Sequence, residues 1–198
     1  MLKLLQPYIL TFIPIFVAVD SLGNIPIFVS LTSGLNIKQK KRVIIESIVT
    51  ATVIAFVFMF IGKFILRIMG VTVSDFKVAG GILLLVISIN LLLLGKRTGS
   101  MLSSLKDVGI FPLGTPLITG PAVLTTTLMM VDSFGLIPTF WSLLLNMIIA
   151  WLFFKYADTF IRLMGDAAIR AFSKVAYILL ASIAVMMIRK GITEVFLP

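Results

Sequence analysis

Hydrophobic residues along the chain gather into long runs separated by short polar stretches. Runs of about 20 apolar residues are typical of helices that cross a membrane. The runs predict six such helices, at residues 8–31, 44–69, 76–94, 110–131, 136–164 and 172–188. The connections between them are too short for a separate soluble domain. The pattern therefore predicts an all-α polytopic membrane protein, with a single transmembrane domain over residues 1–198.

Two of these runs are interrupted by residues that are costly inside a membrane. The first run contains AVDSLGNIPIF, residues 18–28, and the fourth contains PLGTPLITGPAVLTT, residues 112–126. In hydrocarbon, backbone polar groups need internal partners, so a break persists only where protein or a water-filled cavity covers it. We therefore predict that the first and fourth helices are broken near the midplane and that both breaks line a cavity.

The interrupted segments belong to an internal repeat. ILRIMG at residues 65–70 resembles FIRLMG at residues 160–165, and nearly the same offset aligns Gly23 with Gly120. The two copies are predicted to cover about residues 1–97 and about residues 104–198. Each copy contains three predicted helices, so the second must enter the membrane from the opposite side. Inverted three-helix repeats are typical of secondary transporters, whose sites lie near the midplane where broken helices meet.

The first break carries the signals of a new helix start. Gly23 can adopt backbone angles that are closed to other residues. Asn24 is a favoured N-cap residue, and Pro26 suits the first turn because its missing N–H needs no partner. A half-helix is therefore expected from about residue 25 to about residue 33.

The second break has similar signals, because Thr119 or Gly120 can cap a half-helix that starts at Pro121. Each half-helix would begin with unpaired N–H groups and a partial positive charge of about half an electron. Such an end suits an anionic group, for example a carboxylate. Antiparallel repeats would let the two ends face each other, with Asn24, Thr119 and Thr125 offering neutral hydrogen bonds.

Asp20 is the one acidic residue that lies clearly away from the edges of a predicted span. A charge at the centre of a membrane helix costs roughly 2.5 to 3.5 kcal/mol on insertion scales, so this carboxylate needs a partner. Three roles stay open. It can cap the N–H groups of its own break, bind the ammonium group of a substrate, or carry a proton as a coupling residue.

Composition and charge agree with a membrane protein. The chain is 60% hydrophobic and 13% charged, whereas soluble domains carry about 25% charged residues. A net charge of +9 would suggest nucleic acid in a soluble protein, but here the basic residues lie at helix ends and we expect no nucleic-acid partner. NIKQKKR, residues 36–42, is strongly basic, whereas VDSFGLIP, residues 131–138, has neither Lys nor Arg. The positive-inside rule therefore places the first loop in the cytoplasm and both chain ends outside.

The residue types present limit the chemistry. The chain has no Cys and no His, which removes thiol chemistry, the commonest metal ligand and the commonest general base. Neither an activated nucleophile, nor paired catalytic acids, nor a phosphate-binding loop of the G-x-x-x-x-G-K-[ST] type is recognisable. We therefore expect no enzyme activity, no cofactor and no metal, with H⁺ or Na⁺ as candidate coupling ions.

With these motifs placed, the chain resembles the MarC family, six-span bacterial and archaeal membrane proteins that include SnatA-like neutral amino acid transporters. The resemblance covers nearly the whole chain and rests on VDSLGNIPIF, AGGILLL, PLGTPLITGPAVLTT and RLMG. Asp20, Gly23, Asn24 and Pro26 match the first signature, and Pro116, Gly120 and Pro121 match the second. The resemblance implies an inner-membrane protein that moves small neutral amino acids of the glycine and alanine type. Two positions depart from the family pattern: Ser21 stands where Pro is usual, and Ala122 where Gly is usual.

The leading hypothesis is a secondary transporter for a small zwitterion. Its carboxylate would be received by the half-helix N-termini, and its ammonium group by Asp20 or by backbone carbonyls. The candidate substrate-binding residues are Asp20, Ser21, Gly23, Asn24, Pro26, Thr119, Gly120, Pro121 and Thr125. The alternatives are a LysE-like exporter of amino acids or metabolites, and a membrane scaffold that transports nothing. The lipid bilayer is the expected environment, and the sequence leaves the oligomeric state and the direction of transport open.

Overall fold

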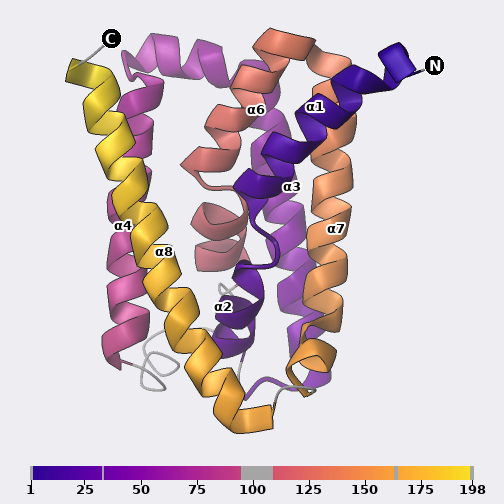
Figure 1. Cartoon of the computed structure of the whole chain (residues 1–198), viewed down its shortest axis with the longest axis vertical. Helices are drawn as coiled ribbons and strands as arrows, with labels where there is room; N and C mark the ends of the chain where they lie inside the picture. The colour runs from indigo at the N-terminus through magenta and orange to yellow at the C-terminus, as the bar shows by residue number, and fades with distance from the viewer. Residues whose placement is uncertain (1, 33, 95–108, 163–164, 197–198) are drawn as a thin grey trace.

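The computed structural model describes residues 2–32, 34–94, 109–162 and 165–196, and all regular structure in these ranges is helical (Figure 1). The elements are α1 (Leu2–Val19), α2 (Asn24–Leu31), α3 (Ile37–Met69), α4 (Val73–Leu94), η2 (Gly109–Ile118), α6 (Pro121–Phe134), α7 (Leu136–Arg162) and α8 (Gly165–Phe196). The RLMG stretch, residues 162–165, lies partly outside the described residues.

The helices run along the long axis of the molecule (Figure 1). The start of α1 and the end of α8 lie at one end, called here the termini end, and the connection from α2 to α3 lies at the opposite end. Together, α1 and α2 lead from the termini end to the opposite end, and η2 and α6 lead back. Both helix breaks therefore lie about midway along the long axis.

Three helices in the described residues are long and apolar enough to cross a membrane: Ile37–Met69, Val73–Asn90 and Leu136–Thr159. They confirm the second, third and fifth predicted spans. The pair η2 and α6, bent by 50° at its break, makes a fourth if the two are taken as one span. The spans expected in α1 with α2 and in α8 stay predictions.

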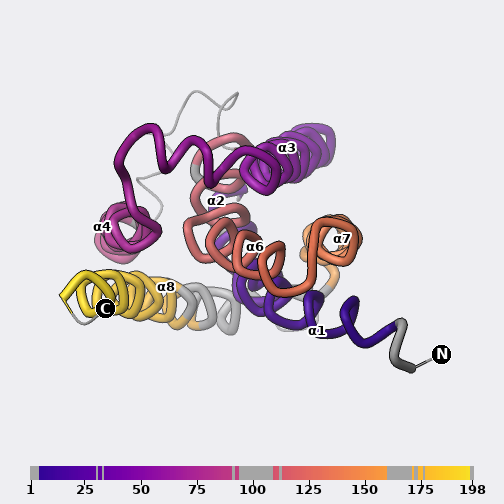
Figure 2. Tube along the Cα trace, turned by 90° about the horizontal axis from the view of Figure 1, so that it is seen from above, coloured from indigo at the N-terminus to yellow at the C-terminus, as the bar shows by residue number. Residues whose placement is uncertain are grey.

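Helices α4 and α8 lie side by side and pack unusually closely (Figure 2). A Cβ atom on Gly81 would lie 2.8 Å from the carbonyl oxygen of Ala184, and one on Gly191 would lie 2.7 Å from that of Ser74. Only glycine allows two backbones to approach to this distance. These two contacts, between the first part of α4 and the last part of α8, join the helices closely at that end.

The other helices form a second group, with η2 and α6 near the centre of the molecule (Figure 2). Here α1 packs on α7, where the hydroxyl oxygens of Thr11 and Ser142 lie 2.6 Å apart. In turn η2 packs on α3. The core is apolar, and within the second group it includes the stacked rings of Phe28 on α2 and Phe154 on α7. The two broken elements are thus enclosed by the long helices.

Candidate functional site

The first break is made by a residue in a left-handed conformation. Helix α1 ends at Val19, and Asp20 follows with a φ of 44°. Aspartate is one of the few residues other than glycine that adopt this conformation, because its short polar side chain can hydrogen-bond locally. The sequence analysis assigned the unusual backbone angles to Gly23. The structure corrects this, since Gly23 has no positive φ.

Glycine is instead required at position 23 because the Asp20 side chain lies very close to it. A Cβ atom on Gly23 would lie 2.3 Å from Oδ2 of Asp20, far inside van der Waals contact. The missing side chain lets the Asp20 carboxylate fold over the turn, where Oδ1 accepts a hydrogen bond from the N–H of Gly23 at 3.1 Å. Of the three roles considered for Asp20, capping is therefore visible in the structure, and it uses only one carboxylate oxygen.

The N-terminus of α2 has no open N–H groups for a ligand. The Gly23 N–H is bound by the Asp20 side chain, and the Asn24 N–H donates to the Asp20 carbonyl at 3.0 Å. The Ile25 N–H donates to a carbonyl of the preceding turn at 3.2 Å, and Pro26 has no N–H. The expectation that both half-helices present open anion sites is therefore corrected for α2, because the break satisfies its own donors.

Asn24 also acts differently from the expected N-cap. Its side-chain amide donates a hydrogen bond to the carbonyl of Val19 at 3.0 Å, so it joins the end of α1 to the start of α2. The half-helix runs over Asn24–Leu31, close to the predicted range of about 25–33. Pro26 lies in its first turn, as predicted.

The second break differs from the first because the N–H groups at the start of its helix have no side-chain cap. Gly120 is the N-cap of α6, with φ −87° and ψ 177°, and no side chain among the described residues caps this helix. Pro121 occupies the first helical position, as predicted. The N–H groups of Ala122 and Val123 are therefore left without a partner inside the helix, together with the positive end of its dipole. This is the arrangement that binds anions.

Thr119 anchors this break and does not cap it. Its buried hydroxyl donates to the carbonyl of Ala51 on α3 at 2.9 Å. This bond fixes the position of the open helix end against a long neighbouring helix.

Both breaks meet at a small internal cavity of about 50 Å³. Asp20 and Asn24 line it from the first break, and Pro116, Gly120, Pro121, Ala122 and Val123 from the second, with apolar residues of α4 and α8 completing the wall. The structure therefore brings the two breaks together, as the internal repeat predicted. An acidic residue of the first break and the first turn of α6 thus line the same cavity.

A larger cavity of about 850 Å³ adjoins the small one and shares Asp20 and Ala122 with it. It lies between α1, α4, α6 and α8, and its polar lining residues are Asp20, Ser21, Thr125, Thr126, Lys77, Lys190 and Glu194. Its volume falls within the range of about 300 to 1,000 Å³ that is usual for ligand pockets. Lys77, near the start of α4, and Lys190 and Glu194, near the end of α8, lie toward the termini end (Figure 1), whereas Asp20 lies at the first break.

Ser21 is a lining residue of the larger cavity, and its hydroxyl is unsatisfied. The residue is 2% exposed, and its Oγ has no hydrogen-bond partner among the described residues. Leaving a buried polar group unpaired costs about 1 to 3 kcal/mol, so this oxygen calls for a ligand or water. Thr125, also buried, donates its hydroxyl proton to the Ala122 carbonyl at 3.2 Å and keeps its oxygen as an acceptor.

The structure divides the sequence-predicted site residues into three sets. Asp20, Asn24, Gly120 and Pro121 line the small cavity, and Asp20, Ser21 and Thr125 line the large one. Gly23, Pro26 and Thr119 line neither cavity and shape the two breaks instead. No group of three or more acidic side chains that could hold a metal ion occurs in the described ranges.

Sequence reasoning missed Gly80 as a residue of the site. A Cβ atom on Gly80 would lie 1.9 Å from Cγ of Pro121, so α4 touches the first turn of α6 at this point. The pair of glycines in the AGGILLL motif indicated that another helix approaches α4 closely. It did not show which helix that is. Gly80 of α4 therefore supports the start of α6.

Comparison with known proteins places the whole chain in one group of membrane proteins. Residues 5–196 match the MarC family of integral membrane proteins. The chain is similar to the UPF0056 membrane protein MJ0972 of Methanocaldococcus jannaschii, with 31% identity covering 98% of this chain and 90% of the relative. It is also similar to a UPF0056 membrane protein of Archaeoglobus fulgidus, with 29% identity covering 93% and 91% of the two chains. No solved structure matches the chain significantly.

Proposed function

Because the chain belongs to the MarC family of integral membrane proteins, we propose that it is a secondary transporter for small neutral amino acids of the glycine and alanine type. One observation carries this proposal. The two broken helices meet at a cavity lined by Asp20 from the first break and by the first turn of α6, which has no side-chain cap among the described residues, from the second. That arrangement suits a substrate with one positive and one negative group.

The proposed architecture has six spans in two inverted repeats, in which α1, α2, α3 and α4 correspond to η2, α6, α7 and α8. The helix contacts support this correspondence, because they occur in matched pairs. The contact of α1 with α7 matches that of η2 with α3, and the contact of α2 with α8 matches that of α6 with α4. Such symmetry lets one repeat rock against the other around a central site, which is the usual basis of alternating access.

The polarity of the site suggests how a zwitterion would lie. Its carboxylate would accept hydrogen bonds from the N–H groups of Ala122 and Val123 at the open end of α6. Its ammonium group would approach Oδ2 of Asp20, which the cap leaves free, and the hydroxyl of Ser21. The small volume of the inner cavity, about 50 Å³, favours a substrate with a short side chain.

The proposed location is the cytoplasmic membrane, with the basic residues 36–42 inside and both chain ends outside. The large cavity would then face the exterior. No bound cofactor or enzyme activity is part of the proposal, and H⁺ or Na⁺ would be the coupling ion. A LysE-like exporter of cationic amino acids is less well supported, because Asp20 is the one acid among the described residues at the breaks.

Counterflow in proteoliposomes tests the proposed function directly. Vesicles loaded with unlabelled alanine are expected to accumulate labelled alanine and glycine, but not labelled lysine or glutamate. Empty liposomes and vesicles loaded with lysine are the controls. Exchange of lysine alone would favour the LysE-like alternative, and the absence of any exchange would favour a scaffold.

Ser21→Ala is expected to weaken alanine binding while leaving the protein at least as stable as before. A hydrogen bond to a charged group contributes about 1.5 to 3 kcal/mol, so KM for alanine should rise about 10-fold or more. Thermal unfolding in detergent should show no loss of Tm, since the substitution removes an unpaired hydroxyl.

Ser88→Ala is the matched control for Ser21→Ala. Ser88 is also buried, but its hydroxyl donates to the Leu85 carbonyl at 2.8 Å and it lines neither cavity. This variant should lose a little stability and keep its KM. A Ser21→Ala protein with unchanged KM would remove Ser21 from the site.

A further inference from the structure

A charged cluster lies in the large cavity, away from the helix breaks. The ammonium group of Lys77 on α4 donates to both carboxylate oxygens of Glu194 on α8, at 2.7 Å each. The Ser74 hydroxyl donates to the same carboxylate at 2.9 Å. Lys190, one turn before Glu194, lines the same cavity. Two positive groups and one negative group are thus gathered in one place.

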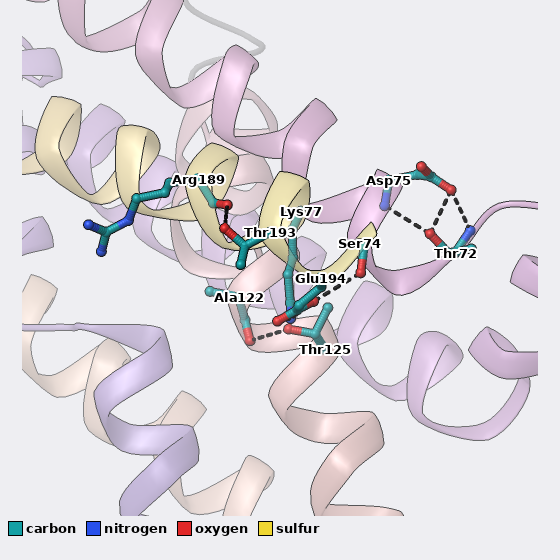
Figure 3. A network of polar contacts seen from close by, with 9 residues as sticks. All are labelled: Thr72, Ser74, Asp75, Lys77, Ala122, Thr125, Arg189, Thr193 and Glu194. Atoms are coloured by element: carbon teal, nitrogen blue, oxygen red, sulfur yellow. Dashed lines mark hydrogen bonds and ion pairs between the residues drawn. The ribbon is translucent and has the colours of Figure 1, made fainter. Parts of the chain in front are cut away.

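The cluster faces the path toward the proposed inner site. Lys77 and Glu194 point toward one another beside Thr125 of α6 (Figure 3). The same cavity wall continues to Ser21 and Asp20 at the first break. A molecule that enters the cavity from the termini end therefore meets the charged cluster before it reaches the breaks.

The ionisation of the cluster is maintained by its own contacts. The hydrogen bond from Lys77, assisted by the Ser74 hydroxyl and the charge of Lys190, lowers the pKa of the Glu194 carboxyl from its ordinary value. Glu194 lies beyond the predicted sixth span, and its side chain is 44% exposed, whereas that of Lys77 is 18% exposed. The lowered pKa favours the ionised form of the Glu194 carboxyl, which is reachable from water.

Holding α4 to α8 does not require this ion pair. The two helices already touch backbone to backbone at Gly81 and Gly191, and a partly exposed ion pair contributes only about 0 to 1 kcal/mol to stability. Lys190 adds a second positive charge near Glu194 and forms no salt bridge of its own among the described residues. A second lysine beside an ion pair whose members can exchange partners is better suited to binding a charged ligand.

We propose that Lys77, Lys190 and Glu194 form an outer binding site, where an amino acid zwitterion is held by both of its charges before it moves to the inner site. The inference rests on the proposed transport function. The substrate carboxylate binds Lys190 and Lys77, and its ammonium group binds Glu194. A cationic amino acid would leave one of its two positive groups without an acidic partner here, so the outer site discriminates against cationic amino acids.

Lys77→Gln and Lys190→Gln test the outer site through transport kinetics. Each is expected to raise KM for alanine counterflow about 2- to 5-fold with little change in the maximal rate, as for the loss of one partly exposed charge contact. Lys77→Arg should retain most of the affinity. In the wild type KM should rise with ionic strength, because salt screens exposed charges, and this dependence should weaken in the variants.

Lys63→Gln is the matched control, because Lys63 forms an exposed ion pair with Asp132 and lines neither cavity. It should leave KM unchanged. Lys190→Gln breaks no observed ion pair, so it tests the site even if Lys77→Gln does not fold. Wild-type flux with unchanged KM in Lys190→Gln and in folded Lys77→Gln, or an equal rise in Lys63→Gln, would overturn the outer site. Absence of wild-type flux would instead overturn the proposed function.

Discussion

Asp20→Asn is expected to abolish most alanine transport while leaving the fold intact. Asparagine also tolerates a left-handed backbone, and its side-chain oxygen can still accept the hydrogen bond from Gly23. The substitution therefore removes the charge and little else. Losing one partner of a buried charge pair costs about 2 to 5 kcal/mol, so the ratio of maximal rate to KM should fall about 30-fold or more. Counterflow of labelled alanine and Tm in detergent measure the two effects.

Comparing two assays of Asp20→Asn separates the roles left open for this residue. Counterflow exchanges substrate without net proton movement, whereas uptake driven by a pH gradient requires a proton carrier. An ammonium ligand is needed in both assays, so both should fail. A proton carrier is needed only for driven uptake, in which case counterflow should persist.

Asp132→Asn is the matched control for Asp20→Asn. Asp132 is an exposed acid on α6 that pairs with Lys63 and lines neither cavity, and its substitution should leave both assays unchanged. If Asp20→Asn were fully active in both assays, capping α2 would be the one role of the three left for Asp20. Asp20→Ala, which also loses the cap, should lower stability by about 1 kcal/mol.

The second large effect is expected for Gly120→Ala, at the open end of α6. A Cβ atom there would lie 2.2 Å from the carbonyl oxygen of Pro116, a backbone atom that cannot move aside freely. The first turn of α6 must therefore shift, and the N–H groups of Ala122 and Val123 shift with it. In enzymes a displacement of about 1 Å at the site costs about 100-fold in rate, and a loss of similar order is expected here.

Gly70→Ala provides the comparison for Gly120→Ala. Gly70 ends α3 with a φ of 66°, and nothing lies within 4 Å of the position that its Cβ atom would take. Alanine there should cost about 1 to 2 kcal/mol of stability through backbone strain alone. Flux per folded molecule should stay at the wild-type level. If Gly120→Ala transports alanine as well as Gly70→Ala does, the open end of α6 is not the carboxylate site.

Much of the candidate site was predictable because its signals are local. Polar and helix-breaking residues inside an apolar run are costly enough to mark both breaks. Pro121 predicted the start of α6, and Pro26 was correctly placed in the first turn of α2. The internal repeat predicted that the breaks meet, and the small cavity between them agrees with this.

Local signals were insufficient where a group has a choice of partners. Gly23 and Asp20 both occur in the first break, but only the folded turn shows that Asp20 takes the left-handed angle and Gly23 makes room for the carboxylate. Asn24 and Thr119 looked like caps by residue type. Their side chains instead donate to Val19 and Ala51, the latter on a different helix.

The sequence by itself determined that this protein is built from apolar helices, that two of them are interrupted, and which residues interrupt them. These properties depend on the free-energy cost of placing polar groups in hydrocarbon. Each segment incurs that cost through its own residues, whatever its neighbours are. The tertiary structure decided that α6 begins without a side-chain cap among the described residues while Asp20 caps α2, that Gly80 packs on Pro121, and that Lys77 and Glu194 line the large cavity. Those outcomes depend on which hydrogen-bond partners and neighbours lie close in space, and segments far apart in the chain supply many of them.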